Sequence, residues 1–271
     1  MIKTIFTALL SLALLTTIAE AQANKRKLTD REDLYGWEAI GRLDVGTQSF
    51  CTGTLITQDL VLTAAHCALD RATGKPYVPG EVTFRAGLSN GTALAERKVV
   101  QIVPHPGYDA GAALSVENIR DDVALMRLEE PIPYSVADPF ALHDGRVPNG
   151  EISIASYGRG RAEAITRERS CNILQRRLGL ITFNCDITFG SSGSAILAKN
   201  GARWQILSVV SAVSVRGGEK IGFGMELKNV VSELKAIMRS NAPKPKASIR
   251  RLQVGSDKSS SGAKFISSGG G

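Results

Sequence analysis

Short runs of β-branched and other apolar residues, separated by turn-forming residues, follow one another along most of the chain. This pattern predicts strands, and apolar positions at helical spacing are almost absent before residue 215. Twelve strands are predicted, at Ala39–Leu43, Thr52–Ile56, Leu60–Thr63, Glu81–Ala86, Glu96–Pro104, Val123–Leu128, Ile152–Tyr157, Ser170–Leu174, Ile181–Cys185, Ser194–Ala198, Gln205–Val213 and Ile221–Glu226. Strands without intervening helices are typical of β-barrels or β-sandwiches, and a gap near residues 131–139 divides them into two runs.

A helical pattern follows the last predicted strand. Leu227, Val230, Val231, Leu234 and Met238 are spaced so that they share one face of a helix. We therefore predict a helix over residues 227–240 whose apolar face covers one side of the β-core.

The two ends of the chain differ from this body. Lys3, an apolar run and then small residues at Ala19 and Ala21 are typical of a secretory signal peptide, predicted over residues 1–22, and the run is shorter than a membrane span requires. Residues 23–33 are highly charged and are predicted to form a mobile leader. Residues 242–271 are basic and rich in Ser and Gly, and are predicted to be disordered.

The formal net charge of +7 is concentrated in that C-terminal tail. The tail contains one acidic residue, Asp257, and six basic ones, at Lys244, Lys246, Arg250, Arg251, Lys258 and Lys264. The body between signal peptide and tail is therefore close to neutral, which argues against a nucleic-acid partner. The tail could associate weakly with anionic envelope surfaces, or it could be a solvated tail without a partner.

All four cysteines follow the predicted signal peptide, and export to an oxidising compartment favours disulfides. Three pairings are possible, and the local sequence favours Cys51 with Cys67 and Cys171 with Cys185. No Cys-x-x-Cys, His-x-x-x-His or calcium-loop spacing is present. We expect neither a metal nor a cofactor.

The stretch Phe189–Ser194, FGSSGS, is the first candidate for chemistry. A serine nucleophile needs a base, and histidine titrates in the right range. The chain has three histidines. We expect His105, which lies between two prolines, and His143, which precedes Asp-Gly, to be solvated loop residues. His66 instead follows an apolar strand and directly precedes Cys67, which makes it the candidate base.

The motifs LVLTAAHC (60–67), DDVAL (121–125) and GSSGS (190–194) occur in this order along the chain. Together they resemble the trypsin/chymotrypsin-like serine peptidases, over roughly Trp37 to Met238. The resemblance implies an all-β fold of two six-stranded antiparallel β-barrels with a C-terminal helix. The peptidase domain would span residues 34–241, with barrels at about 34–132 and 140–226.

The resemblance also implies roles for individual residues. His66 would be the general base and Ser192 the nucleophile. Asp122 would orient His66; Asp121 competes for this role, but Asp122 directly precedes the apolar strand, as the family's acid does. The backbone N–H groups of Gly190 and Ser192 would bind the oxyanion.

Two departures from the family pattern narrow the resemblance. Ser191 stands where members activated by cleavage have an aspartate, and the tetrapeptide Ile-Val-Gly-Gly, typical of their new amino terminus, is absent. We therefore expect no such zymogen switch. Gly193-Ser194-Ala195 and the stretch YGWEAIGRL (35–43) resemble the bacterial branch that includes V8-like glutamyl endopeptidases.

The position six residues before the nucleophile lies at the base of the family's primary specificity pocket, and here it is Asp186. An acid there would favour Arg or Lys at the substrate position P1, although Asp186 could instead form only local hydrogen bonds. The same alignment places Ser211, Val213, Gly222 and Gly224 along the pocket. Val213 would replace the histidine of glutamyl peptidases.

The sequence therefore predicts a monomeric serine endopeptidase, secreted or periplasmic, that acts on protein or peptide substrates. The alternative is a catalytically inactive trypsin-like homologue that serves as a binding protein in the cell envelope. Inactive homologues commonly lack one member of the triad, whereas all three residue types are present here.

Overall fold

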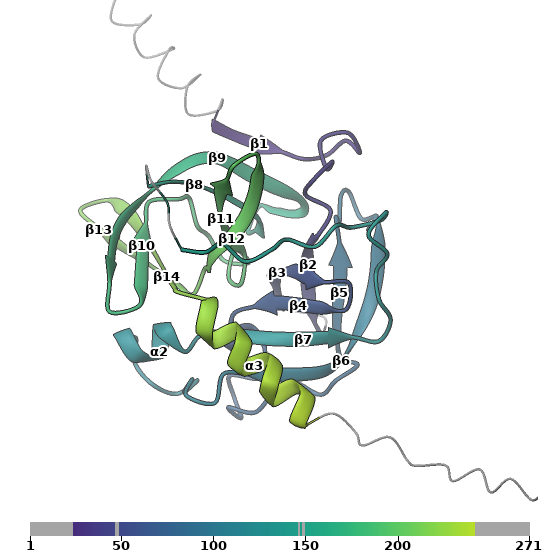
Figure 1. The fold of residues 1–271 in the computed structure, drawn as a ribbon, viewed down its shortest axis with the longest axis horizontal. Coiled ribbons are helices and arrows are strands. Elements are labelled where there is room, and N and C mark those ends of the chain that lie inside the picture. Colours follow the sequence, from purple (N-terminus) through teal and green to yellow (C-terminus); the bar gives the residue numbers. More distant parts are fainter. Residues whose placement is uncertain (1–23, 47–48, 146, 148–149, 242–271) are drawn as a thin grey trace, which may run out of the picture. The chain divides into compact units, whose positions relative to one another are not determined.

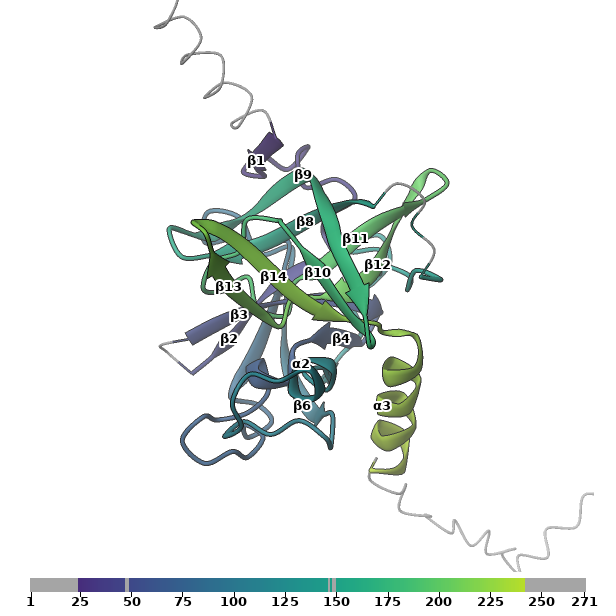
Figure 2. The ribbon, with the colours of Figure 1, turned by 90° about the vertical axis from the view of Figure 1, so that its left-hand side faces the viewer.

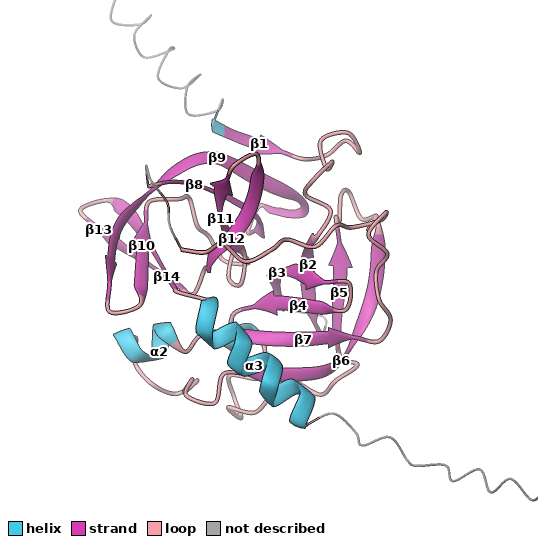
Figure 3. Cartoon of the chain, viewed as in Figure 1, coloured by secondary structure: helices cyan, strands magenta, loops and turns pink. Residues whose placement is uncertain are grey.

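A computed structural model of the chain describes residues 24–46, 49–145, 147 and 150–241. The predicted signal peptide (1–22) and the predicted disordered tail (242–271) lie outside the described residues. Strands dominate the described part, and two α-helices, labelled α2 and α3, lie beside them (Figure 3). None of the helices among the described residues is long and apolar enough to span a membrane.

The first half of the chain forms a closed antiparallel barrel in the order β2-β3-β4-β7-β6-β5. Its strands are β2 (Ile40–Val45), β3 (Ser49–Thr57), β4 (Leu60–Thr63), β5 (Val82–Ala86), β6 (Ala95–Pro104) and β7 (Ala124–Leu128). All four residues of β4 are buried between β3 and β7, as its uninterrupted apolar sequence predicts. Side chains such as Leu43, Leu62 and Phe84 fill the interior.

The second half forms an eight-stranded antiparallel sheet whose main path is β12-β11-β8-β9-β10-β14-β13. Its strands are β8 (Glu151–Gly158), β9 (Arg161–Arg177), β10 (Leu180–Phe183), β11 (Ala195–Asn200), β12 (Arg203–Val209), β13 (Ala212–Arg216) and β14 (Glu219–Met225), with β1 (Lys25–Lys27) paired to β9. Figure 2 shows this sheet beside the barrel. The six strands predicted for this half correspond to seven observed ones, β8 to β14.

Two elements of this sheet differ from the predicted strands. β9 is far longer than Ser170–Leu174, because its first part pairs with β8 and its last part with β10. The predicted strand Gln205–Val213 divides into β12 and β13 at Ser211, whose N–H donates to Phe223 of β14. The pairing with neighbouring strands determines both boundaries.

The prediction of a mobile leader is wrong for residues 24–28. Lys25–Lys27 form β1 along β9 (Figure 1), and Asn24 exchanges two hydrogen bonds with Ser170. Leu28 is buried, and its N–H donates to Ile165. Backbone hydrogen bonds to a strand edge need no apolar side chains, so a charged segment can form a strand where one apolar residue packs beside it.

The C-terminal helix α3 (Lys228–Ser240) lies against β6 and β7 of the barrel. Its apolar face buries Val231, Leu234 and Met238, which confirms the predicted C-terminal helix. The short helix α2 (Val116–Arg120) was not predicted. It begins at Ser115, whose hydroxyl accepts a hydrogen bond from the N–H of Asn118, and it leads directly into Asp122.

Both disulfides pair as the local sequence favours, Cys51 with Cys67 and Cys171 with Cys185. The first joins β3 to the one-turn 3-10 helix Ala65–Cys67. The second joins β9 to the segment that follows β10. Each therefore fixes backbone close to a predicted site residue, His66 in one case and Asp186 in the other.

Candidate active site

His66 is held in place by local structure on both sides. Buried β4 ends at Thr63, the short 3-10 helix follows, and the disulfide of Cys67 fixes that helix to β3. The His66 N–H lies 2.9 Å from Asp122 Oδ1, and its ring Nδ1 lies 2.7 Å from Asp122 Oδ2. Two contacts to one carboxylate orient the ring and leave Nε2 available for proton transfer.

Asp122 has a third partner from the other half of the molecule. Its side chain is almost fully buried, and Ser211 Oγ, between β12 and β13, donates to Oδ2 at 2.6 Å. A buried carboxylate with several donors fits a group that stabilises a histidinium. Burial, and to a lesser extent the charge of Asp122, also raise the pKa of nearby Tyr108 to about 12.

The competing acid Asp121 lies apart from His66. Its carboxylate is 3.7 Å from the ring of His105, which also lies 3.8 Å from Glu233 of α3. His143 does not fit the expectation of a solvated loop residue: it is buried, and its Nδ1 accepts from the N–H of Gly145. The structure therefore places Asp122, and not Asp121, beside the candidate base.

Ser192 lies in the turn between β10 and β11. Its carbonyl accepts from the N–H of Thr52 at 2.9 Å, and the N–H of Gly193 donates to Val210. Gly193 has φ +77°, and a Cβ at this position would lie 2.0 Å from Thr63 Oγ1, so only glycine fits. These contacts attach the turn to the barrel and to β12.

Ser192 and His66 share the wall of one cavity, although no hydrogen bond joins their side chains in the part of the chain that the structure describes. Such bonds are often long without substrate and tighten in the complex. The N–H groups of Gly190 and Ser192 donate to no acceptor among the described residues. Both are therefore available to a substrate oxygen.

The two neighbouring serines are buried and point away from the cavity. Ser194 Oγ donates to the carbonyl of Ser191 at 2.7 Å. Ser191 Oγ contacts Ser156 Oγ and the carbonyl of Tyr157. Of the three hydroxyls in FGSSGS, only that of Ser192 belongs to a residue in the cavity wall.

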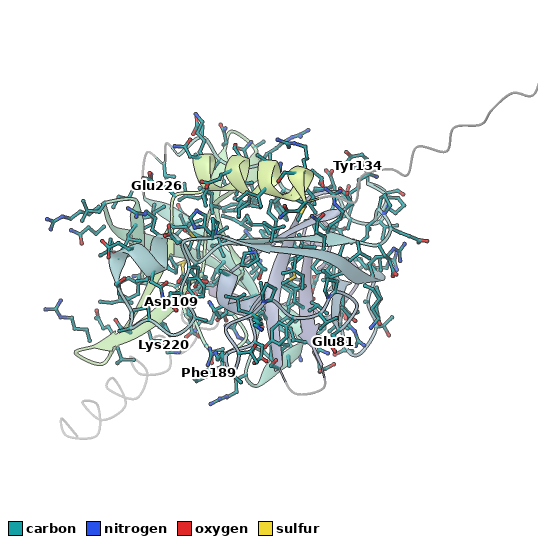
Figure 4. The ribbon with its side chains drawn as sticks, turned by 90° about the horizontal axis from the view of Figure 1, so that it is seen from below. Glu81, Asp109, Tyr134, Phe189, Lys220 and Glu226 are labelled. Carbon is teal, nitrogen blue, oxygen red and sulfur yellow. A yellow bond between two sulfur atoms is a disulfide. The ribbon has the colours of Figure 1, made fainter. Side chains whose placement is uncertain are left out.

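The cavity beside Ser192 has a volume of about 540 Å³. Ser211 and Val213 line it as the sequence predicts, together with Ile187 and Lys220, which the sequence did not reveal. Figure 4 shows Lys220 and Phe189 on the side of the molecule opposite α3. A second cavity of about 760 Å³ also has His66 and Ser192 in its wall, so space for a chain extends along two sides of the serine.

Three residues predicted to line the pocket do not line this cavity: Asp186, Gly222 and Gly224. Gly222 packs beneath the side chains of Phe183 and Ile187, since a Cβ there would lie 2.3 Å from both. Gly224 packs in the same way against β12. The space expected for a deep pocket is therefore filled by apolar side chains beside Gly222, and by Ser208 and the backbone of Val209 beside Gly224.

The Asp186 carboxylate is occupied by two lysines. Oδ2 lies 2.8 Å from Lys25 Nζ of β1, and Oδ1 lies 2.7 Å from Lys220 Nζ of β14. Burial acts to raise the pKa of Asp186, but the hydrogen bonds and charges of the two lysines outweigh it and lower that pKa to about 2. The only sequence signal for these partners is the general need of a part-buried acid for a cation.

One group of potential metal ligands occurs among the described residues, namely Cys51, His66 and Cys67. Its two sulfur atoms are bonded to each other in the disulfide, so they are not thiolate ligands. The cluster belongs to the scaffold of His66.

A trypsin family model matches residues 29–233 of this chain. The match spans most of the chain and includes the barrel, strands β8 to β14 of the second sheet, and His66, Asp122 and Ser192. The protein therefore belongs to the trypsin family of serine proteases.

Named relatives agree with this assignment. Serine protease SP24D of Anopheles gambiae is 36% identical over 121 residues, which are 42% of this chain and 39% of that protein. Serine protease 23 of Rattus norvegicus is 29% identical over 226 residues, 69% of this chain and 55% of that protein. The chain spans about half the length of the curated relatives it matches or less.

A solved Glu endopeptidase, in complex with MPD, has the same fold. It superposes with a TM-score of 0.65 over 80% of this chain and 97% of that one, at 21% sequence identity. This likeness shows the chymotrypsin-like architecture.

Proposed function

We propose that this protein is a serine endopeptidase that hydrolyses peptide bonds through an acyl-enzyme. The observation that carries the proposal is the chain of contacts from Ser211 through Asp122 to His66, which ends at the cavity shared with Ser192. A chain that lacked catalysis would need no buried carboxylate aligned on a histidine beside a serine that lines the same cavity.

The residues support the following steps. His66 Nε2 takes the proton of Ser192 Oγ as that oxygen attacks the substrate carbonyl, and the oxyanion binds the N–H groups of Gly190 and Ser192. Collapse of the tetrahedral intermediate breaks the C–N bond of the substrate peptide, and His66 donates its proton to the leaving amine. Water then attacks the ester while His66 takes its proton, and His66 returns that proton to Ser192 Oγ as the ester C–O bond breaks and the acid is released. Asp122 stabilises the histidinium both when the acyl-enzyme forms and when it is hydrolysed.

Labelling by a fluorophosphonate tests this proposal. The wild type is expected to be labelled at one serine, and Ser192→Ala is expected to abolish labelling, with Ser194→Ala as the matched control that retains it. Labelling that survives Ser192→Ala contradicts the assignment of the nucleophile. A folded wild type that takes no label favours the alternative of an inactive binding protein.

The expected preference for Arg or Lys at P1 loses its basis, because Lys25 and Lys220 already bind Asp186. We propose instead that P1 is an uncharged side chain that packs on Ile187, Val213 and Val215 in the cavity wall. Peptide anilides with Phe or Leu are then cleaved faster than those with Arg. Faster cleavage of the Arg anilide would contradict this proposal and support a preference for basic P1 side chains.

We also propose that the protein is exported from the cytoplasm. Two disulfides and the predicted signal peptide support a secreted or periplasmic monomer. The amino terminus of the mature protein, determined by sequencing, is expected near residue 22.

We also propose that the tail, residues 242–271, tethers the protein to anionic surfaces. Retention of the protein on an anionic resin should then depend on salt and be lost when residues 242–271 are deleted; equal retention of the two forms overturns that role.

A further inference from the structure

We propose that Arg161 is a positioning residue that holds the turn bearing Ser192 and the oxyanion N–H groups in its reactive geometry, by binding the side chain of Ser191. The inference rests on the proposed peptidase function. In family members that are activated by cleavage, the new amino terminus is expected to support this turn. Here Arg161 would support it instead.

Arg161 connects two segments that border the active site. It is the first residue of β9, and its Nη2 donates to Ser191 Oγ and to the carbonyl of Asp186, both at 3.2 Å. One guanidinium group thus contacts the residue directly before the nucleophile and the segment that leads to Ile187 in the cavity wall.

The hydroxyl of Ser191 is the centre of a buried polar cluster. The residue is fully buried, and its Oγ donates to the carbonyl of Tyr157 and lies 3.1 Å from Ser156 Oγ. The N–H of Thr188 also points at it, at 3.4 Å. Among the residues that the structure describes, Arg161 is the one charged donor to this hydroxyl, and charge-assisted hydrogen bonds are about twice as strong as neutral ones.

The backbone beside Arg161 leaves room for its side chain. Gly158 lies beside its path, and a Cβ at that position would be 2.9 Å from Arg161 Nε and 2.5 Å from Thr188 Cγ2. Burial lowers the pKa of Arg161, while the carboxylates of Asp186 and Glu168 oppose that shift. A part-buried cation is retained where nearby acids and acceptors compensate its desolvation.

Ser191 controls the turn because its backbone is bonded on both sides. Its N–H donates to Thr188 at 2.9 Å, and its carbonyl accepts from the N–H of Ser194 at 3.1 Å. The two N–H groups proposed to bind the oxyanion belong to the residues immediately before and after it. A displacement of Ser191 therefore moves both donors and the nucleophile together, and a shift of about 1 Å can reduce a rate about 10²-fold.

Steady-state kinetics of Arg161→Met test the inference. We expect kcat to fall about 10- to 100-fold while KM changes less than about threefold, because the turn and not the substrate cavity is disturbed. Arg167→Met is the matched control. Arg167 lies on the same strand, part-buried over the rings of Trp37 and Trp204, so its loss is expected to lower the melting temperature but not kcat.

Ser191→Ala supplies a second route if Arg161→Met folds poorly. It removes the acceptor of the Arg161 hydrogen bond together with the donor to the carbonyl of Tyr157, and we expect it to lower kcat at least as much. In the double variant the two effects are expected to be less than additive, as for residues that act through one contact. Additive effects, or a kcat equal to that of the wild type in both single variants, overturn the inference.

Hydrogen exchange separates this inference from the proposed function. The amides of residues 188–194 are expected to exchange faster in Arg161→Met than in the wild type and in Arg167→Met. A wild type that takes no fluorophosphonate removes the peptidase proposal, yet this exchange still reports whether Arg161 holds the turn. A labelled wild type with unchanged exchange in Arg161→Met overturns the role of Arg161 and leaves the peptidase intact.

Discussion

The two halves of the molecule position their catalytic groups by different means. The barrel holds His66 and Asp122 through a closed apolar wall, a disulfide and hydrogen bonds to one carboxylate. Around the turn that carries Ser192, the second half instead combines Arg161, Asp186 and Lys220 with Lys25 from the start of the described chain. The candidate base is thus held by packing, a disulfide and one carboxylate, whereas several charged side chains support the turn of the candidate nucleophile in addition to its backbone hydrogen bonds. Substitutions of charged residues should therefore have different consequences in the two halves.

The largest expected effect tests the barrel half. Asp122→Asn is expected to lower kcat about 10⁴-fold, because the amide cannot stabilise the histidinium and favours the wrong tautomer of His66. The matched control is Asp121→Asn, whose carboxylate faces His105 and which is expected to change kcat little. Kinetics on a peptide anilide give the comparison. Equal losses in the two variants contradict the choice of Asp122.

That choice shows how far sequence reasoning reaches in the barrel. Apolar runs predict each barrel strand, because every strand there carries its own local signal, and the motif around His66 indicates the candidate base. The helix α2 is the exception, since five residues give too little pattern to recognise. Its N-cap at Ser115 is visible in the sequence only once the helix is known.

The second half is less predictable for a physical reason. Its other strands were found, but β1 depends on backbone pairing with a part of β9 more than 100 residues away. The pairing of Asp186 with Lys25 has the same origin, whereas the length of β9 and the packing of Phe183 and Ile187 on Gly222 depend on neighbouring strands. Sequence patterns report the preference of a segment for helix, strand or turn. These contacts depend instead on which residue the fold places opposite another.

A medium effect is expected when the charge balance of the second half is changed. Removal of both lysines, in Lys25→Met/Lys220→Met, leaves Asp186 without a cation beside the cavity that Lys220 lines. We expect the ratio of kcat/KM for Arg over Phe anilides to rise about tenfold, since an unpaired acid attracts a basic P1 side chain. The charge-conserving variant Lys25→Arg/Lys220→Arg is the control. An unchanged ratio would show that Asp186 does not reach the substrate site.

The smallest expected effect concerns stability in acid. The pKa of Asp186, at about 2, lies below its ordinary value of 3.8, so its pairs with lysine stabilise the fold fully above about pH 4. That contribution is lost as the pH falls toward 2. The side chain is 37% exposed, so solvent screening limits the contribution to about 1 kcal/mol or less, or about 2–4 °C in Tm.

Thermal unfolding of the wild type and Asp186→Asn, followed by circular dichroism from pH 5 to pH 2, measures this contribution. We expect the wild type to be more stable at pH 5 and the two curves to converge toward pH 2, because protonation removes the charge that the variant already lacks. Arg42→Met, in the barrel, removes a cation paired with Asp44 and serves as a comparison for an ion pair that does not involve Asp186. A gap between the wild type and Asp186→Asn that stays constant over this range would mean that packing, and not charge, supports the second half.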